Sequence, residues 1–207
     1  MNWTLQHWPI VAICAGMLAA AIIDWWKFKV PNKLTFPLII SGWVLGLLNT
    51  LGWTTAIYGG DGGIVSSLAG TLLAMALLLP LYAIGGMGAG DVKMTMGFGA
   101  WIGAFYGFGG PESSQPNGML IIVYAFCAGA IVGGIIAACM IVLKGKYKDN
   151  AEHVREIASD FASSSGITDI AEKANSRRPR WHRLPYGVPL CIGFLGYLIY
   201  FYTKTGA

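Results

Sequence analysis

The chain has 207 residues, of which 55% are apolar and only 12% are charged. A soluble protein of this length needs more polar side chains than this to cover its surface, so the composition argues against a soluble protein and indicates a membrane protein. The formal net charge is +4. Because the basic residues lie mainly in alternate connections, we read this charge as a topology signal and do not expect a nucleic-acid partner.

Six apolar segments have about the length that one helical crossing of a bilayer requires. In chain order they run from Trp8 to Ile23, Phe36 to Trp53, Gly63 to Ile84, Met94 to Phe108, Met119 to Leu143 and Tyr186 to Tyr202. We therefore expect an all-α polytopic membrane protein with six transmembrane helices, forming a single domain over residues 1–207. The first segment is not preceded by Lys or Arg, so we expect a retained helix and not a cleaved signal peptide. The 29 glycines predict close packing between helix backbones.

Basic residues concentrate in alternate connections between these segments. Thirteen of the fourteen Lys and Arg lie in the first, third and fifth connections, and none lies in the second or fourth. The positive-inside rule then places both chain ends outside and the odd-numbered connections in the cytoplasm.

The fifth connection, at about residues 144–185, is the one long polar stretch. The spacing of Val154, Ile157 and Phe161 predicts a short amphipathic helix within it, followed by a turn at "SSSG". Its role stays open between a membrane-surface segment, a substrate contact and a solvated linker.

Two aspartates border predicted helices on the cytoplasmic side. Asp24 ends the first crossing in "AAAIIDWWKFKVPN", and Asp91 begins the fourth in "GAGDVKM". The second and third crossings make a full return trip between them, so we expect both aspartates at one depth although 67 positions separate them. Each residue alone also has a structural explanation, Asp91 as a helix N-cap and Asp24 as an interfacial side chain.

Paired carboxyl groups in a poorly solvated place have a chemistry of their own. Held close together they share a proton and titrate as a pair. One then deprotonates water while the other protonates a peptide carbonyl oxygen, so the pair can hydrolyse an amide bond. We expect neither a metal nor a cofactor. The four cysteines lie inside predicted crossings without a C-x-x-C pair, and we interpret them as buried free thiols.

Three motifs in order make the sequence resemble the type IV prepilin peptidases, membrane aspartic proteases of the G-x-G-D type. They are Asp24 followed by "VPN" (Val30 to Asn32), "GAGDVK" (Gly88 to Lys93) and "RLPYGVPL" (Arg183 to Leu190). In the third motif we assign "PYG" a structural role at the start of the last helix. The resemblance covers nearly the whole chain.

The resemblance implies an activity, a partner and a set of site residues. The activity is cleavage of the leader peptide of a type IV prepilin or pseudopilin at the cytoplasmic face of the inner membrane. The partner in the bilayer is the substrate's hydrophobic helix. The catalytic pair is Asp24 and Asp91, and the residues that shape the site are Pro31, Asn32, Gly88, Gly90 and Lys93. Which aspartate is the base, which pilin is cleaved and the oligomeric state stay open.

Larger members of that family carry an N-terminal cytoplasmic region with paired C-x-x-C motifs, associated with methylation of the new pilin N-terminus. Here the first predicted crossing begins at Trp8. We therefore expect peptidase activity without methyltransferase activity, as in the short members that process Flp-type pilins.

Three other interpretations fit part of the sequence. Presenilin-like proteases pair the G-x-G-D aspartate with a Tyr-Asp motif, whereas Ile23 precedes Asp24 here. A proton-coupled transporter places ionisable groups near mid-membrane, and the six core segments contain no charged residue. A non-catalytic pilus assembly factor with the same fold is not excluded by sequence.

Overall fold

The computed structural model describes residues 7–27, 30–53, 61–83, 87–109, 117–144 and 186–205. Its helices are α2 (Trp8–Lys27), α3 (Asn32–Thr50), α5 (Ile64–Ala83), α6 (Ala89–Tyr106), α7 (Gly118–Lys144) and α10 (Gly187–Thr205). Each predicted crossing coincides with one of them. The described ranges contain no strand, which confirms the all-α prediction for this part of the chain. The amphipathic helix predicted around Val154 to Phe161 lies outside the described residues.

Four of the described helices are long and apolar enough to cross a membrane, namely α2, α3, α5 and α7. Helices α6 and α10, with 18 and 19 residues, are not among them. A multi-pass membrane protein is therefore supported by four helices. The count of six crossings and the outside position of both ends stay predictions.

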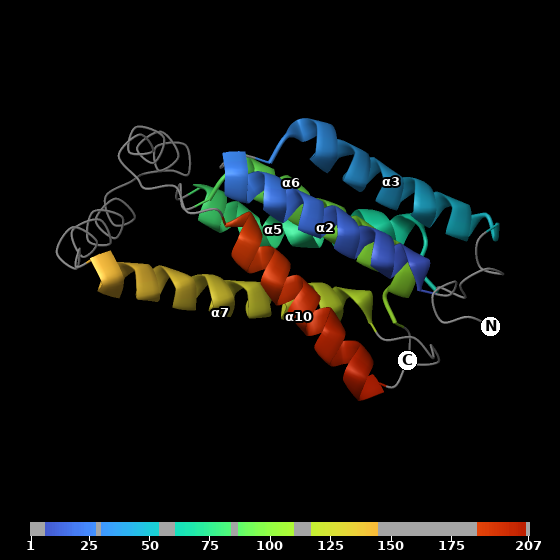
Figure 1. Ribbon diagram of the computed structural model, residues 1–207. Coiled ribbons are helices and arrows are strands. Elements are labelled where there is room, and N and C mark those ends of the chain that lie inside the picture. Colours follow the sequence, from blue (N-terminus) through green and yellow to red (C-terminus); the bar gives the residue numbers. More distant parts are fainter. Residues whose placement is uncertain are drawn as a thin grey trace, which may run out of the picture.

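Helix α6 is the central element of the bundle. Fourteen of its 18 residues are buried, and it contacts α2, α3, α5 and α7; in Figure 1 it runs behind α2. A helix enclosed by protein meets little lipid, so it needs small side chains more than apolar ones. This enclosure explains why α6 combines a low hydropathy with a membrane-protein fold.

Glycines set the distance between α6 and its neighbour α5. A Cβ atom at Gly99 would lie 2.3 Å from the carbonyl oxygen of Gly70, and one at Gly103 would lie 2.2 Å from that of Ser66. Any larger residue would push the two backbones apart. The predicted glycine-rich packing is therefore confirmed at this contact.

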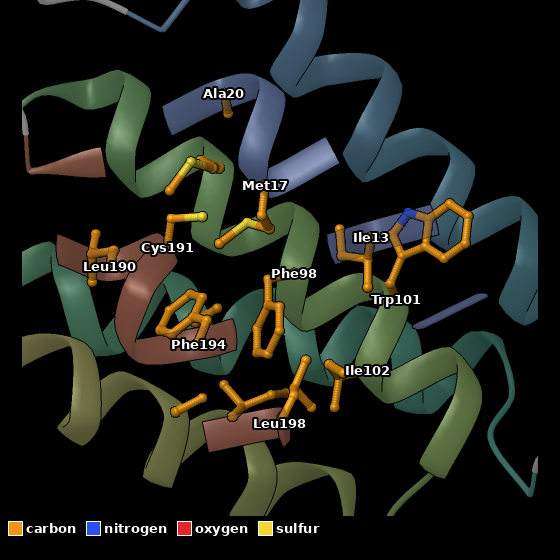
Figure 2. Close-up of a cluster of buried hydrophobic side chains, with 14 of the residues drawn as sticks. Ile13, Met17, Ala20, Phe98, Trp101, Ile102, Leu190, Cys191, Phe194 and Leu198 are labelled. Atoms are coloured by element: carbon orange, nitrogen blue, oxygen red, sulfur yellow. The ribbon is translucent and has the colours of Figure 1, made fainter. Parts of the chain in front are cut away.

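Aromatic stacking joins α6 to the last helix. The rings of Phe98 and Phe194 stack with their centroids 4.5 Å apart. Figure 2 shows Phe98 between Met17 of α2 and Leu198 of α10, and all four side chains are buried. This cluster holds α2 and α10 on the same side of α6, so the ends of these helices have defined positions relative to one another.

The prediction of buried thiols is wrong for two of the four cysteines. Cys191 is buried and Cys14 is half-buried, but Cys127 and Cys139 are exposed on α7. Helix α7 packs mainly against α10 and leaves most of its surface uncovered by protein. Thiols and apolar side chains are tolerated there because lipid, not water, is the expected surrounding of such a surface.

Candidate active site

The structure brings Asp24 and Asp91 to the same end of the bundle. Asp24 lies in the last turn of α2, and Asp91 is the third residue of α6. In Figure 1 the end of α2 and the starts of α6 and α10 lie at one end of the molecule. The aspartates are 4% and 5% exposed, and the charge of Asp24 acts on Asp91. Two acidic side chains from distant segments thus share one buried environment.

The start of α10 supplies a hydrogen bond to Asp24. The backbone N–H of Gly187 donates to Oδ2 of Asp24 over 3.0 Å. A Cβ atom at Gly187 would lie 2.8 Å from the same oxygen, so the contact has no room for a side chain. The third sequence motif therefore reaches the first through this bond.

One of the two carboxylate oxygens of Asp91 makes a helix-capping hydrogen bond. The backbone N–H of Gly88, the N-cap residue of α6, donates to Oδ2 of Asp91 over 3.3 Å. The other oxygen, Oδ1, is buried and has no hydrogen-bond partner among the described residues. Buried polar atoms are nearly always hydrogen-bonded, so Oδ1 is left able to take part in a further hydrogen bond that helix capping does not provide.

Asn32 and Lys93 link the first two motifs. Pro31 is the N-cap residue of α3, with φ −73° and ψ 141°. In the next position, the Oδ1 atom of Asn32 accepts a hydrogen bond from Nζ of Lys93 over 2.9 Å. The same ammonium group lies 4.8 Å from the centre of the Phe36 ring. Lys93 therefore fastens the start of α3 to the start of α6, beside Asp91.

The two motif glycines differ in what surrounds them. A Cβ atom at Gly90 would lie 3.1 Å from both Cβ and the carbonyl oxygen of Val30, which is tight. At Gly88 the nearest atom would be Oδ2 of Asp91, at an ordinary 3.4 Å. The "VPN" segment thus passes directly over Gly90, whereas the space around Gly88 admits a methyl group.

Sequence reasoning did not identify two residues of this site. Gly187 was given only a structural role, yet its N–H binds Asp24. Tyr186, just before it, interacts electrostatically with Asp91. The available signal was the glycine between prolines at the start of the last helix, which permits a close backbone approach. No local pattern indicates which side chain approaches it.

The described residues contain no cluster of three His, Cys, Asp or Glu side chains able to hold a metal ion. Metal independence remains a prediction, which a chelation experiment tests.

Comparison with known proteins agrees with the motifs. A family model described as the type IV leader peptidase family matches residues 11–134, which include both aspartates. Prepilin leader peptidase/N-methyltransferase from Burkholderia pseudomallei strain 1026b and its counterpart from strain K96243 are each 32% identical to this chain over 124 residues. That alignment covers 58% of this chain, which spans only 35% of the length of these relatives. No solved structure shows a significant match. Since the family model matches more than half of the sequence, the chain belongs to the type IV leader peptidase family.

Proposed function

We propose that the protein is a membrane aspartyl endopeptidase that removes the leader peptide of type IV prepilins or pseudopilins, in particular those of the Flp type. Family membership and the printed name of the two relatives support this reaction. The observation that supports the proposal most is that Asp24 and Asp91 are both buried, Asp24 in the last turn of α2 and Asp91 in the first turn of α6.

Such a pair supplies the two proton transfers of amide hydrolysis. One carboxylate takes a proton from water, which attacks the scissile carbonyl carbon, and the other carboxyl group protonates the carbonyl oxygen. Burial strengthens the electrostatic interactions of the two carboxyl groups with the reacting atoms, because little water screens them. The reaction needs no covalent intermediate.

We place this chemistry at the cytoplasmic face of the plasma membrane. The basic residues of the first connection, Lys27, Lys29 and Lys33, follow Asp24 directly, and Lys93 follows Asp91. A leader that precedes a hydrophobic helix meets the enzyme at this rim when that helix lies in the bilayer. The substrate helix and the lipid are therefore the partners that we propose.

We further propose that the chain cleaves without methylating. It contains no C-x-x-C pair, and the segment that the family model matches, residues 11–134, holds both aspartates. Mass spectrometry of the cleaved pilin should find an unmodified N-terminal amine when this protein is the sole processing enzyme. An N-methylated product from the purified protein would contradict this part of the proposal.

The test is co-expression with a candidate prepilin and measurement of precursor size by immunoblot. Asp24→Asn and Asp91→Asn should each reduce cleavage by at least about a hundredfold, because each variant removes one of two required proton transfers. Asp61→Asn is the matched control, since Asp61 is an exposed aspartate at the opposite end of the bundle. Full cleavage by either site variant, with the protein present in the membrane, would rule out the pair.

The same experiment separates the main alternative. An unsubstituted chain that cleaves no prepilin, in cells where pilus assembly nevertheless depends on it, would be an assembly factor instead of a peptidase.

A further inference from the structure

We infer that the backbone N–H of Gly187 is a positioning group, which holds Asp24 as the ionised, water-activating member of the pair while Asp91 carries the proton. The inference rests on the proposed function and assigns the two roles that the sequence leaves open. It follows from the different surroundings of the two carboxyl groups.

Asp24 has the surroundings that favour a carboxylate. The N–H of Gly187 is the first of α10, and it donates to Oδ2 of Asp24 over 3.0 Å. The exposed N–H groups at a helix start carry partial positive charge, which stabilises an anion placed against them. This donor comes from a different helix, so its distance to Asp24 depends on how α10 packs against α2.

Asp91 has the surroundings that favour the protonated form. Its bond from the N–H of Gly88 is longer, at 3.3 Å, and its buried Oδ1 has no partner among the described residues. An ionised carboxylate with an orphaned buried oxygen is costly, whereas a proton on that oxygen removes the charge. An ionised Asp91 would also add a second negative charge at the end of the bundle where Asp24 is buried.

Glycine is required at position 187 for space and not for backbone conformation. Positive φ angles occur at Gly52, Gly107 and Gly109 among the described glycines, and Gly187 is not one of them. An added Cβ would lie 2.8 Å from Oδ2 and 3.2 Å from Cγ of Asp24. A methyl group here must therefore displace the carboxylate from its donor.

With these roles the reaction balances. Asp24 takes a proton from water, the water oxygen bonds to the carbonyl carbon, and Asp91 gives its proton to the carbonyl oxygen to form a neutral diol. On collapse one diol hydroxyl returns its proton to Asp91, Asp24 protonates the leaving nitrogen, and the carbon–nitrogen bond breaks. Both aspartates end in their starting states.

The other titratable groups near this pair are few in the described part of the chain. Tyr186, just before α10, interacts with Asp91. On α2 itself, Lys27 is exposed to the outside of the bundle. Lys93 on α6 bonds Asn32.

The experiment measures the proton on each aspartate directly, without a substrate. Dicyclohexylcarbodiimide adds to protonated carboxyl groups in a membrane, and mass spectrometry of the purified full-length protein locates the adduct at a series of pH values. In the unsubstituted protein, Asp91 should stay reactive to a higher pH than Asp24. In Gly187→Ala, the reactivity of Asp24 should extend upward by about one to two pH units, because a bond to a charged group is lost.

Gly196→Ala is the matched control, since an added Cβ at that position on the same helix has no atom within 4 Å. It should leave both labelling ranges unchanged. Helix content by circular dichroism, compared among the unsubstituted protein, Gly187→Ala and Gly196→Ala, reports whether the variant is folded.

Two results would overturn the inference. One is the same Asp24 labelling range in Gly187→Ala and Gly196→Ala. The other is an unsubstituted protein in which Asp24 stays reactive to a higher pH than Asp91. Absence of prepilin cleavage by the unsubstituted protein would instead refute the proposed function, and the order of labelling would still decide the part played by Gly187.

Discussion

At the scale of single residues, the site depends on two glycines whose lack of a side chain leaves room for neighbouring groups. Gly90 and Gly187 each lie where another part of the chain passes within contact distance. Val30 occupies the space beside the first and Asp24 the space beside the second. The two carboxylates keep their places because these glycines admit their neighbours.

Gly90 and Gly88, the two glycines of the second motif, should respond differently to substitution by alanine. Gly90→Ala places a methyl group 3.1 Å from Val30, so the "VPN" segment and the start of α6 must separate. We expect leader cleavage to fall by at least about tenfold, since displacement of about 1 Å near reacting groups can cost a hundredfold. Cleavage is measured as precursor remaining after co-expression.

Gly88→Ala is the control for this pair, because its added methyl group meets only an ordinary contact of 3.4 Å with Asp91. It should retain cleavage within about threefold, since surface-like substitutions without new clashes have small effects. Equal losses in the two variants would show that close passage of Val30 is not what Gly90 provides.

At the scale of helices, contacts between backbones hold the bundle together. Helix α10 crosses α7 at Gly193 and Gly129, where an added Cβ at Gly193 would lie 2.1 Å from the backbone nitrogen of Gly129; Figure 1 shows this crossing. The same helix begins at Gly187, beside Asp24. A shift of α10 on α7 therefore also moves the donor to Asp24.

Stability measurements should reveal this crossing. Gly193→Ala forces the two backbones apart, and overpacking of this kind costs about 1–3 kcal/mol. We expect a lower unfolding temperature in detergent for this variant. Gly196→Ala should be neutral or slightly stabilising, since its side chain meets no atom and alanine favours a helix. An unchanged unfolding temperature for Gly193→Ala would contradict the close crossing.

At the scale of the whole molecule, the bundle gathers the polar groups of the candidate site at one end of an apolar body. Both aspartates, the Asn32–Lys93 bond and the start of α10 lie together there. In the proposed mechanism, the two carboxyl groups at this end hydrolyse an amide bond without a metal ion. The proposal also requires that this end of the bundle faces the cytoplasm.

Chelation tests the chemistry of the whole enzyme. We expect cleavage by the purified protein to continue within about twofold in EDTA or phenanthroline, because proton transfer between carboxyl groups and water needs no metal. The measurement is the rate of leader release with and without chelator. Loss of activity that returns on addition of zinc or another divalent metal would contradict the mechanism.

Cysteine labelling tests the orientation. In a background where the four native cysteines are replaced, a membrane-impermeant thiol reagent should label Asp61→Cys from outside intact cells. Lys27→Cys should react only after the membrane is opened, because the positive-inside rule places the first connection in the cytoplasm. Both positions are exposed, so access is decided by the side of the membrane alone. The reverse pattern would invert the proposed topology.

Much of the fold could be predicted from local sequence. Each predicted segment contains a helix, since a long apolar run has few other ways to satisfy its backbone in a membrane. Helices α6 and α10 are the two predicted crossings that are not among the four helices long and apolar enough to cross a membrane. These helices lie against other helices along much of their length. Their side chains therefore have to fit protein neighbours more than they have to be soluble in lipid.

Composition and motif order by themselves determined the membrane class, the all-α fold, the family and the choice of Asp24 and Asp91. These follow from hydropathy and short patterns, which are properties of neighbouring residues. The tertiary structure alone decided that Gly187, 163 positions away, binds Asp24, and that the two carboxyl groups have different surroundings. The physical reason is that a hydrogen bond depends on distances of tenths of an ångström between packed helices, which no local pattern specifies.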